Sequence, residues 1–547
     1  MSSRCLVIQT IASGTTESMR RCYLAADRRA DVVELRVDTV RDLDLDRLLG
    51  ARGKPKLITA RSRRQGGGCR PADRGPLLRR ALAAGVEYVD LEFGDQDLPL
   101  LRHRGRSRRI LSHHALESTP ADLPALRARM ESVAGGALLK IVTYADVASD
   151  ALRVRDLLRS SPPGSLIAFC MGPKGIPSRV LAPLWGSAAV YAPLRDAAET
   201  ASGQVPLEDL FDLYRFDRID GDTRLLGVVG SPVAHSLSPR MHNAALAAAG
   251  LNYRYLPFEV ASLGEFLPLI SELPIAGLSV TLPHKEKILA YLDGIDEVAR
   301  AVGAVNTVVK RWNRLEGFNT DVEAALAPLR RALSLKGKRV ALLGAGGAAR
   351  ALLYGLMREG ARVTIFNRTP SRAATLARQF GARHLPWERL RGFRCELLIN
   401  ATSVGLAPDS HRSPVPAAWI AAPRVYDIVY NPPETRLLRM ARSRGAEVLG
   451  GADMFVAQGA AQYRMFTGRE PPVEVMRRAA LEALGVPAEA AAAGRAAPPE
   501  RRRRVAPAGG GAPRRGAGPG PAADRGRAGA HRGARPGRAG RRRRAGG

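Results

Sequence analysis

The chain has 547 residues, too many for one hydrophobic core, and this length predicts roughly three domains, or two large ones with a tail. Its five cysteines are scattered, odd in number and without CxxC spacing, which argues against a disulfide framework and structural zinc. No apolar run approaches the roughly 18 residues of a membrane span, and the apolar run 5–12 is too short for a secretory signal. We therefore expect a soluble, cytoplasmic protein with no membrane partner.

The formal net charge of +32 is unevenly distributed along the chain. From residue 491 onward, sixteen arginines stand against Glu500 and Asp524, so fourteen of the positive charges lie in the last 57 residues. This Ala/Gly/Pro/Arg-rich segment lacks aromatic residues and cannot bury enough surface to order, so we predict a disordered tail over 488–547. Two interpretations stay open: an arm that grips nucleic acid or another acidic surface, and an extension without a function. Elsewhere we expect no nucleic-acid partner.

Eight short apolar runs, partly β-branched, come before residue 200, at 5–11, 32–37, 56–60, 86–93, 109–112, 137–143, 166–170 and 188–192. Stretches rich in Leu, Arg and Ala separate most of them and have helical character, for example 76–84, 124–133 and 151–159. Eight alternations in about 215 residues predict a (β/α)₈ barrel, in which the chemistry gathers at the C-terminal ends of the strands.

Polar residues stand at these strand ends or in the loops that follow them: Glu34, Arg36, Arg61, His113, His114, Arg179 and Gln204. Lys140 differs because it lies inside the apolar run LLKIV at 138–142, where burying a lysine is costly unless something uses it. Desolvation and nearby cations lower the pKa of a lysine and make it an amine nucleophile toward ketones. The alternative is a lysine that snorkels to the surface at a strand end.

This set of motifs resembles the type I 3-dehydroquinate dehydratases. VELRVD at 33–38, TARSRRQGG at 59–67, SHHALESTP at 112–120, LLKIV at 138–142, GIPSR at 175–179 and SGQ at 202–204 follow that family's order and spacing across 1–220. The resemblance implies that Lys140 forms a Schiff base with the substrate ketone, and that His114 removes the C2 proton and helps water leave. It also implies which residues hold the substrate's carboxylate and hydroxyls: Glu34, Arg36, Arg61, Arg179 and Gln204.

The segment departs from that family's pattern at several positions. Gln65 stands where many members have a glutamate near the histidine, and a glutamine can weaken the orienting contact to His114. Ala115 follows the histidine in place of Asp or Asn, and Thr200 and Ser202 replace the usual Ser and Pro of the last loop. We expect these changes to alter the rate rather than to abolish the chemistry.

A polar link at 221–224 leads to a new strand at 225–229 and then to the loop GSPVAHSLSPRMHN at 230–243, where Ser236 and Ser238 expose hydroxyls. The strings GLSVTLPHKE at 277–286, GAVNT at 303–307 and GFNTD at 317–321 follow. His235, His242 and His284 lie in these strings without metal-ligand spacing, so we predict no metal site.

The run KRVALLGAGGAAR at 338–350 predicts a strand, a glycine turn and a helix. Gly344 and Gly346 match the first two glycines of the GxGxxG dinucleotide fingerprint, and Ala349 replaces the third. Such glycines let the backbone approach a pyrophosphate, at which the first N–H groups of the helix point. On this motif alone, a tight strand-to-helix turn in some other α/β protein is the alternative.

The next strand, RVTIF at 362–366, decides between these readings. It ends in Asn367-Arg368-Thr369, where an NAD site would place a carboxylate for the ribose hydroxyls. Arg368 instead offers a guanidinium fork suited to a 2′-phosphate. The sequence therefore predicts an NADP site.

These strings resemble shikimate dehydrogenase. They are followed by INATSVGL at 399–406, VYDIVYNPPET at 425–435 and GGADMFVAQGAAQYRMFTG at 450–468, and the resemblance spans 224–487. It implies a substrate lobe at about 224–325, a Rossmann-like NADP lobe at about 326–450, and C-terminal helices that return to the substrate lobe. The departure is Val322-Glu323, where members often have a glycine close behind the aspartate.

By this resemblance Lys285 and Asp321 are the acid/base pair, and a lysine paired with a carboxylate can donate a proton to the alkoxide that forms when a ketone is reduced. The residues implied to bind shikimate are Ser236, Ser238, Thr281, Asn306, Tyr430 and Gln458. The residues implied to bind NADP are Gly344, Ala345, Gly346, Gly347, Ala348, Asn367, Arg368, Thr369 and Thr402.

The two resemblances imply successive steps of aromatic amino-acid biosynthesis. 3-Dehydroquinate is dehydrated to 3-dehydroshikimate, and NADPH then reduces this product to shikimate. Two alternatives stay open: the second half acts on quinate with NAD, or the chain is a binding protein with decayed sites whose basic tail grips nucleic acid. The retained Lys140, His114, Lys285 and Asp321 argue against decay.

Overall fold

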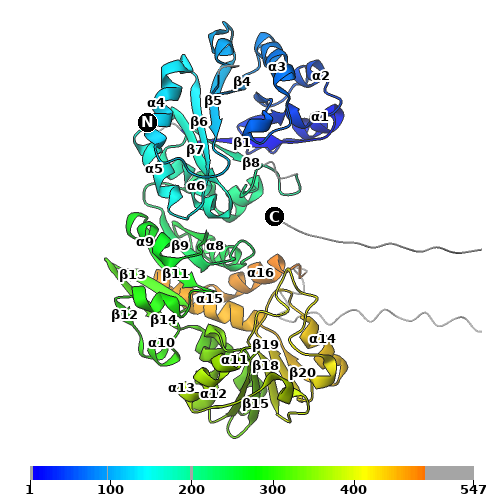
Figure 1. The fold of residues 1–547 in the computed structure, drawn as a ribbon, viewed down its shortest axis with the longest axis vertical. Helices are drawn as coiled ribbons and strands as arrows, with labels where there is room; N and C mark the ends of the chain where they lie inside the picture. Colours follow the sequence, from blue (N-terminus) through cyan, green and yellow to red (C-terminus); the bar gives the residue numbers. More distant parts are fainter. Residues whose placement is uncertain (1–3, 95–96, 198–200, 487–547) are drawn as a thin grey trace, which may run out of the picture. The chain divides into compact units, whose positions relative to one another are not determined.

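The structure is a computed structural model and describes residues 4–94, 97–197 and 201–486 (Figure 1). The predicted tail at 488–547 and the departure at Thr200 lie outside the described residues. Three sheets organise the described part: one of eight strands, followed along the chain by two of six strands each.

The first sheet is parallel throughout and runs in the order β7-β6-β5-β4-β3-β2-β1-β8. Its strands are β1 (Leu6–Ile11), β2 (Val32–Arg36), β3 (Lys56–Thr59), β4 (Tyr88–Glu92), β5 (Arg108–His114), β6 (Leu138–Tyr144), β7 (Leu166–Met171) and β8 (Ala189–Ala192). Strands β7 and β8 share no ladder, but the N–H of Ala188 donates to the carbonyl of Leu166 at 2.8 Å across the seam. The sheet is thus a nearly closed barrel, and the predicted (β/α)₈ fold is confirmed.

Helices separate the barrel strands: α1 (Thr16–Leu24), α2 (Leu45–Leu49), α3 (Pro71–Ala83), α4 (Leu123–Ala134), α5 (Asp150–Arg159), α6 (Ile176–Val180) and α7 (Ala182–Trp185). In α5 the buried positions Ala151, Val154, Leu157 and Leu158 recur at helical spacing and form one apolar face. Burying each such leucine or valine contributes about 1.5–3 kcal/mol. All six residues of β7 are buried, as expected for a parallel strand covered on both faces.

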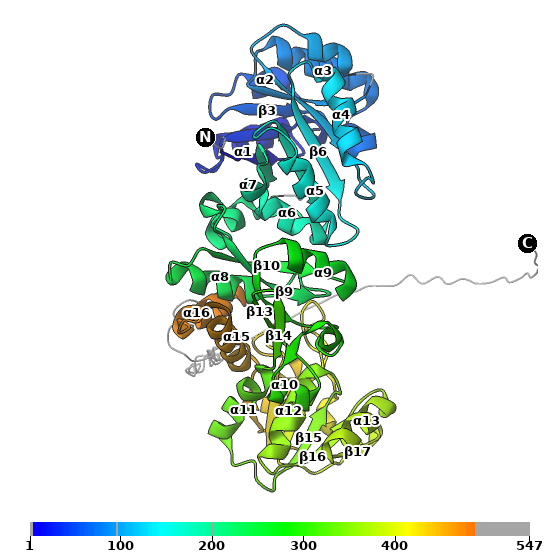
Figure 2. The same cartoon turned by 90° about the vertical axis from the view of Figure 1, so that its left-hand side faces the viewer.

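The second sheet is mixed and has the order β10-β9-β11-β13-β14-β12. Its strands are β9 (Arg224–Gly230), β10 (Tyr253–Glu259), β11 (Ile275–Val280), β12 (Gly294–Ile295), β13 (Thr307–Arg311) and β14 (Arg314–Phe318). The accompanying helices are α8 (Ser238–Ala248), α9 (Leu263–Glu272) and α10 (Glu297–Val302), and α9 is seen beside β9 and β10 in Figure 2. We call this layer the substrate lobe.

The third sheet is parallel, with the order β17-β16-β15-β18-β19-β20. Its strands are β15 (Arg339–Leu343), β16 (Arg362–Phe366), β17 (Arg383–Leu385), β18 (Leu397–Asn400), β19 (Arg424–Asp427) and β20 (Glu447–Leu449), and its helices are α11 (Asp321–Ala332), α12 (Gly347–Arg358), α13 (Pro370–Phe380) and α14 (Arg436–Ser443). The strand order reverses between β15 and β18, where dinucleotides bind in Rossmann-like folds. This layer, the NADP lobe, confirms the predicted Rossmann-like architecture.

Two last helices, α15 (Ala452–Thr467) and α16 (Val473–Ala483), pack against α8 of the substrate lobe. Met241 of α8 shares an apolar cluster with Phe455 and Tyr463 of α15 and Met476 of α16. Because α15 follows the last strand of the NADP lobe directly, it links the two lobes.

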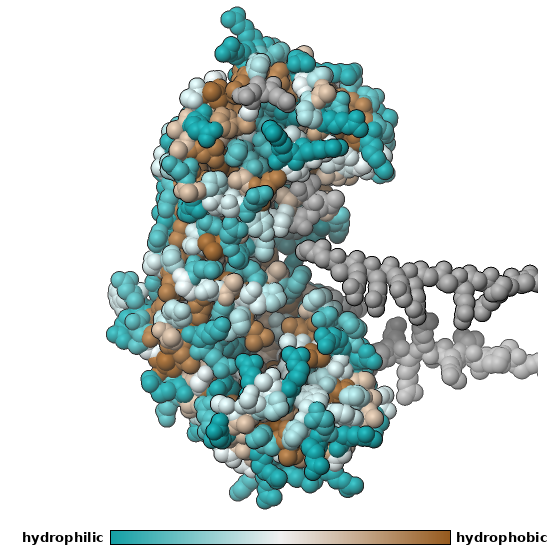
Figure 3. Space-filling model, viewed as in Figure 1, coloured by the Kyte–Doolittle hydropathy of each residue, from teal (hydrophilic) through white to brown (hydrophobic). Residues whose placement is uncertain are grey.

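The face seen in Figure 3 alternates hydrophilic and hydrophobic residues over short distances. None of the helices in the described ranges is long and apolar enough to cross a membrane.

Candidate active sites

A cluster of buried charges lies inside the barrel, with Lys140 of β6 at its centre. The side chain of Lys140 is 4% exposed, and its Nζ lies 3.4 Å from Oδ2 of Asp90 in β4. Nζ also lies 3.8 Å from the centre of the Tyr191 ring in β8. Burial lowers the pKa of Lys140, and Arg61 and Arg36 add to this effect, whereas the carboxylates of Asp90 and Glu34 oppose it. The lysine is therefore buried and does not snorkel.

His114 ends β5 and belongs to the same cluster. Its Nδ1 lies 2.9 Å from Oε1 of Gln65. The glutamine that stands in place of the family's glutamate therefore still contacts the histidine, but through a neutral amide. Burial lowers the pKa of His114 well below its usual value, and the positive charges of Arg61 and Lys140 add to this effect. The imidazole is therefore neutral. With the amide oxygen of Gln65 as acceptor, Nδ1 carries the proton and Nε2 keeps its lone pair.

Two arginines lie beside these groups. Arg61, which follows β3, pairs with Asp90 at 2.9 Å and donates to the hydroxyl of Ser112 at 2.8 Å. Arg36, at the end of β2, makes two hydrogen bonds to Asp38, at 2.9 and 2.8 Å. Carboxylate partners fix both guanidinium groups in place before any ligand binds.

The three remaining candidates in the barrel, Glu34, Arg179 and Gln204, differ in their burial and in their contacts. Glu34 accepts hydrogen bonds from Thr10 and Thr59, each at 2.8 Å, and is buried. Arg179 of α6 is buried and lies over the Phe169 ring at 4.3 Å, and this ring lies 6.0 Å from that of Tyr191. Gln204 lies half-buried on the loop after β8, where its Oε1 accepts from the N–H of Ala201 at 3.3 Å.

The sequence interpretation missed Asp90 and Tyr191, which contact Lys140 directly. Burial raises the pKa of Asp90, but Arg61 and Lys140 outweigh this effect and hold the pKa below its usual range, so Asp90 is ionised. Asp90 lies inside the apolar run 86–93, just as Lys140 lies inside the apolar run 138–142. A search of every predicted strand for a charged residue inside an apolar run would have found Asp90.

The second site is a cavity of about 940 Å³ lined by both the substrate lobe and the NADP lobe. Eight residues predicted for catalysis or substrate binding line it: Ser236, Ser238, Thr281, Lys285, Asn306, Asp321, Tyr430 and Gln458. The fold brings them together from segments that are far apart in the chain.

Lys285 and Asp321 form an ion pair in this cavity, with Nζ 2.5 Å from Oδ2 of the carboxylate. The other carboxylate oxygen accepts from the Asn306 amide at 2.8 Å. Oδ1 of Asn306 accepts in turn from the N–H of Thr320 at 2.8 Å, immediately before α11. The carboxylate is thus oriented from two sides, which leaves one oxygen directed at the lysine.

Aromatic and amide groups line another part of this cavity. The ring of Tyr430 stacks on Phe455 with centres 4.2 Å apart, and burial raises the pKa of Tyr430 to about 12, so the phenol is protonated. Gln458 lies on α15 and donates to the carbonyl of Phe455 at 3.3 Å. Ser236 accepts from the N–H of Ser238 at 3.3 Å, which fixes the start of α8.

Ser279 and Gln462 also line the cavity, and the sequence interpretation missed both. Ser279 accepts from the Tyr255 hydroxyl at 2.7 Å and donates to Oε1 of Gln462 at 2.7 Å. Nε2 of Gln462 donates to Thr307 and to the Asn306 carbonyl, both at 3.1 Å. Both residues lie inside sequence motifs identified above, at 277–286 and 450–468, but neither motif indicates that the two side chains are in contact.

The glycine turn after β15 has the geometry that a pyrophosphate needs. Gly344 has φ +112°, and a Cβ there would lie 2.9 Å from the carbonyl oxygen of Ala401. At Gly346 a Cβ would meet nothing within 4 Å, so open space lies beside the turn. Gly346 precedes α12 without a side-chain cap, which leaves the first N–H groups of the helix available to an anion.

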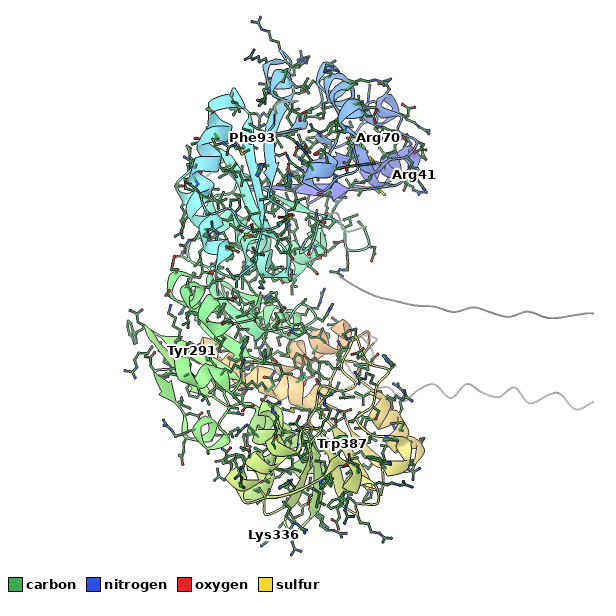
Figure 4. All side chains as sticks on the ribbon, in the orientation of Figure 1. Arg41, Arg70, Phe93, Tyr291, Lys336 and Trp387 are labelled. Carbon is green, nitrogen blue, oxygen red and sulfur yellow. The ribbon has the colours of Figure 1, made fainter. Side chains whose placement is uncertain are left out.

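Four predicted cofactor residues line the cavity, namely Ala348, Asn367, Arg368 and Thr402, whereas Gly344, Ala345, Gly346, Gly347 and Thr369 are their chain neighbours outside its lining. Trp387, labelled in Figure 4, and Glu388 line it as well. These residues fit a dinucleotide that carries an extra phosphate, because a guanidinium and helix N–H groups face one continuous space.

Two contacts tie the cofactor turn to its surroundings. A Cβ at Gly347 would lie 3.0 Å from Cδ of Lys285, so the turn packs directly on the lysine. Thr402 donates to Asn400 at 2.7 Å, and Asn400 donates to the buried Asp427 at 2.9 Å. Across the described ranges, no group of three or more His, Cys, Asp or Glu residues is placed to hold a metal ion.

Known protein families match consecutive parts of the chain. Residues 7–220 match the type I 3-dehydroquinase family, and residues 228–308 match the shikimate dehydrogenase substrate-binding domain. Residues 326–404 match the shikimate/quinate 5-dehydrogenase family, and residues 451–481 match the shikimate 5′-dehydrogenase C-terminal domain.

Individual relatives show the same division. A chloroplastic bifunctional 3-dehydroquinate dehydratase/shikimate dehydrogenase from Arabidopsis thaliana is 34% identical, over 82% of this chain and 79% of the relative. A shikimate dehydrogenase (NADP(+)) from Moorella thermoacetica is 44% identical, over 50% of this chain and 99% of the relative. A solved shikimate 5-dehydrogenase from Thermus thermophilus, in complex with NADP(H) and shikimate, is 42% identical over 48% of this chain and 100% of its own, with a TM-score of 0.44.

Proposed function

The chain belongs to the family of bifunctional 3-dehydroquinate dehydratase/shikimate dehydrogenases, and from this premise we propose which residues carry each of its two reactions. It dehydrates 3-dehydroquinate to 3-dehydroshikimate and reduces that product to shikimate with NADP as the redox cofactor. The observation that carries the assignment is the presence of two separate lysine sites: Lys140, buried in the barrel beside a neutral His114, and Lys285, paired with Asp321 in the cleft.

In the barrel, the neutral amine of Lys140 adds to the substrate ketone, and loss of water gives a protonated imine. Nε2 of His114 removes the C2 proton, and the electron pair flows to the imine nitrogen. His114 then returns this proton to the departing hydroxyl, which leaves as water. Addition of water to the imine releases the product and restores the lysine. The lowered pKa values of Lys140 and His114 support both roles, because nucleophile and base must be uncharged.

The other predicted barrel residues are proposed to hold the substrate. The guanidinium groups of Arg36, Arg61 and Arg179 provide positive charge for its carboxylate, while Glu34 and Gln204 accept from its hydroxyls. Asp90 joins them because it contacts both Lys140 and Arg61. Burying the guanidinium of Arg61 beside an ionised carboxylate costs less than burying it alone.

In the cavity lined by the substrate lobe and the NADP lobe, NADPH supplies the hydride when bound. Lys285 gives a proton to the oxygen that becomes the alcohol, and Asp321 keeps the ammonium oriented toward it. Asn306 holds the carboxylate in place, which supports a fixed direction for the proton. Ser236, Ser238, Thr281, Tyr430 and Gln458 are proposed to bind the hydroxyls and carboxylate of the substrate.

On the NADP lobe, the turn Gly344 to Ala348 and the N-terminus of α12 are proposed to hold the pyrophosphate. Asn367, Arg368 and Thr369 are proposed to hold the 2′-phosphate end, and Thr402 closes the opposite wall. Arg368 supports NADP over NAD because a guanidinium stands where an NAD site needs a carboxylate.

The division of the chain remains part of this proposal. We assign the dehydratase to 1–220, the dehydrogenase to 224–487 and the basic tail to 488–547. All five cysteines are free thiols, which supports a reducing compartment, and we propose the cytoplasm.

The proposal is tested by one incubation. Purified protein, 3-dehydroquinate and NADPH are mixed, NADPH consumption is followed by absorbance, and shikimate is identified by chromatography. We expect shikimate to accumulate without addition of a second enzyme. Formation of 3-dehydroshikimate without shikimate would contradict the assignment of the second half.

A further inference from the structure

A second cavity of about 350 Å³ lies on the substrate lobe, and neither reaction uses the residues that line it. They are Ala261, Ser262, Leu263, His284, Lys287 and Tyr291, and Figure 4 labels Tyr291. The lining combines the segment before and at the start of α9 with the segment 284–291 on either side of Lys285.

At the start of α9, beside this cavity, the N–H of Glu265 donates to the Ser262 carbonyl at 3.2 Å, whereas the N–H groups of Leu263 and Gly264 have no partner among the described residues. Ser262 is its N-cap residue, and the Ser262 side chain makes no capping hydrogen bond. The first N–H groups of a helix have no partner within the helix, and the helix dipole favours negative charge beside them. Glu265 is the acidic residue of this first turn, and it does not line the cavity.

Lys287 adds a positive charge to the same space. It is exposed, and in the described part of the chain no carboxylate lies within ion-pair distance of it. The neighbouring Glu286 is directed elsewhere, at Arg350, whose Nε lies 3.4 Å away. The positive charge of Lys287 is therefore available to a ligand.

His284 points to the identity of the ligand. It is 1% exposed, and its Nε2–H donates to the carbonyl oxygen of Val260 at 2.7 Å. Nδ1 of the same ring is buried and has no hydrogen-bond partner among the residues that the structure describes. Because Nε2 holds the proton, Nδ1 offers a lone pair. A buried acceptor without a donor is destabilising, which favours a ligand that brings a donor.

We propose that this cavity binds a small oxyanion that keeps one hydroxyl hydrogen, of which hydrogen phosphate is the simplest. Its charged oxygens accept from the N–H groups at the start of α9 and from Lys287. Its hydroxyl donates to Nδ1 of His284. Sulfate has the same shape and charge but no hydroxyl at neutral pH, so this geometry discriminates between the two anions.

The test observes Nδ1 directly. The protein is labelled with ¹⁵N-histidine, saturated with NADP⁺ so that phosphate does not compete for Arg368, and titrated with sodium phosphate at constant ionic strength. The variant His284→Gln assigns the ring resonance among the nine histidines, because one signal disappears. We expect the His284 Nδ1 resonance to shift saturably with phosphate, and sulfate to bind at least about tenfold more weakly, since the buried acceptor is then left unpaired.

Two lysine variants provide the matched comparison. Lys287→Gln removes the cavity's side-chain charge, and we expect it to weaken phosphate binding about fivefold to tenfold. Lys336→Gln removes an exposed charge outside the cavity (Figure 4) and should leave the titration unchanged. Calorimetry on His284→Leu provides a second measurement, because leucine has no hydrogen-bond acceptor in place of Nδ1, and phosphate should then bind no better than sulfate.

The proposal is overturned if the His284 resonance does not respond to phosphate, or if phosphate and sulfate shift it equally. It is also overturned if Lys287→Gln and Lys336→Gln have the same effect, since the binding would then reflect general charge. Should either His284 variant fail to fold, the response ratio of the two anions in the unaltered protein still decides the question.

Discussion

Lys140 and Lys285 are the same type of side chain in two different surroundings. Lys140 is enclosed by a barrel, faces an aromatic ring, and shares its carboxylate Asp90 with Arg61. Lys285 lines an open cleft and has Asp321 as its own ion-pair partner. Burial and neighbouring cations favour the neutral amine in the first case, whereas in the second the lysine pairs with a carboxylate of its own.

The difference explains how one residue type serves two chemistries. A lysine that attacks a ketone needs a free electron pair on its nitrogen, whereas a lysine that donates a proton must carry a proton on that pair. The barrel obtains the first by burying the lysine and placing two arginines near it, which together outweigh the nearby carboxylates. The cavity of the dehydrogenase half provides the proton donor by pairing Lys285 with Asp321. Each prediction below changes one side of this comparison and leaves the other as a control.

The largest effect is expected for Lys140→Ala, which should lower dehydration at least about 10⁴-fold because the covalent step is lost. In the unaltered protein, borohydride added during turnover should reduce the imine and trap substrate on Lys140, as read by peptide mass spectrometry. Reduction of supplied 3-dehydroshikimate should persist in both cases. An unlabelled Lys140 during dehydration would contradict the Schiff-base mechanism, and loss of reduction in Lys140→Ala would contradict the independence of the two sites.

Lys285→Ala is the mirror experiment. It should lower kcat of the reductase about 10²-fold to 10⁴-fold with little change in the KM for 3-dehydroshikimate, because the lysine acts mainly in the transition state. Dehydration should be unaffected. A raised KM with an unchanged kcat would show instead that Lys285 only binds substrate.

Arg368→Asp tests the cofactor end of the cleft. Replacing a charge-assisted fork by a repelling carboxylate should reduce the preference for NADPH over NADH by about 3 kcal/mol, or roughly a hundredfold in the ratio of kcat/KM values. The measurement is steady-state kinetics with both cofactors. Equal kcat/KM values for NADH and NADPH in the unaltered protein would refute the assignment.

Gln65→Glu replaces the side-chain amide by a carboxylate and so places a negative charge beside His114, the base of the barrel site. A carboxylate at Nδ1 stabilises the imidazolium and raises the pKa of His114, which burial and Arg61 now hold well below its usual value. The base works when neutral, above its pKa, so the acid limb of the dehydration pH profile should move to higher pH by about one unit. Activity would then fall about tenfold at acidic pH and stay unchanged at high pH. An unmoved acid limb would mean that another group controls it.

Ending the chain at Ala490 should have the smallest effect. The composition of the following segment cannot build a site, so both activities should remain at the level of the full chain. Loss of either activity would place part of that site beyond Ala490.

Local patterns were enough to predict the barrel and the Rossmann-like lobe, because short apolar runs and glycine turns have few physical solutions. Lys140 was recognisable from sequence since a charge inside an apolar strand requires an explanation. Asp90 carried the same signal and was overlooked, because its partner lies on a strand two positions away in the barrel.

The rest of each site depends on contacts that no local pattern specifies. The bond between Ser279 and Gln462 joins β11 to α15, and its existence follows from how the last helices fold back. The effect of Gln65 needed its distance to His114, since a glutamine can either hold an imidazole or leave it free. Composition and spacing describe neither of these.

The close packing of Gly347 on Lys285 restricts how this enzyme can evolve. A Cβ at position 347 would lie 3.0 Å from Cδ of Lys285, so the lysine would have to move by a few tenths of an ångström even where the cofactor's contacts are left intact. The tolerated residues at these two positions therefore depend on each other: a bulkier residue at 347 is accessible only together with a change that repositions the proton donor. A glycine at position 347 thus serves the placement of the proton donor as well as the approach of the dinucleotide, and we expect substitutions at positions 347 and 285 to depend on each other.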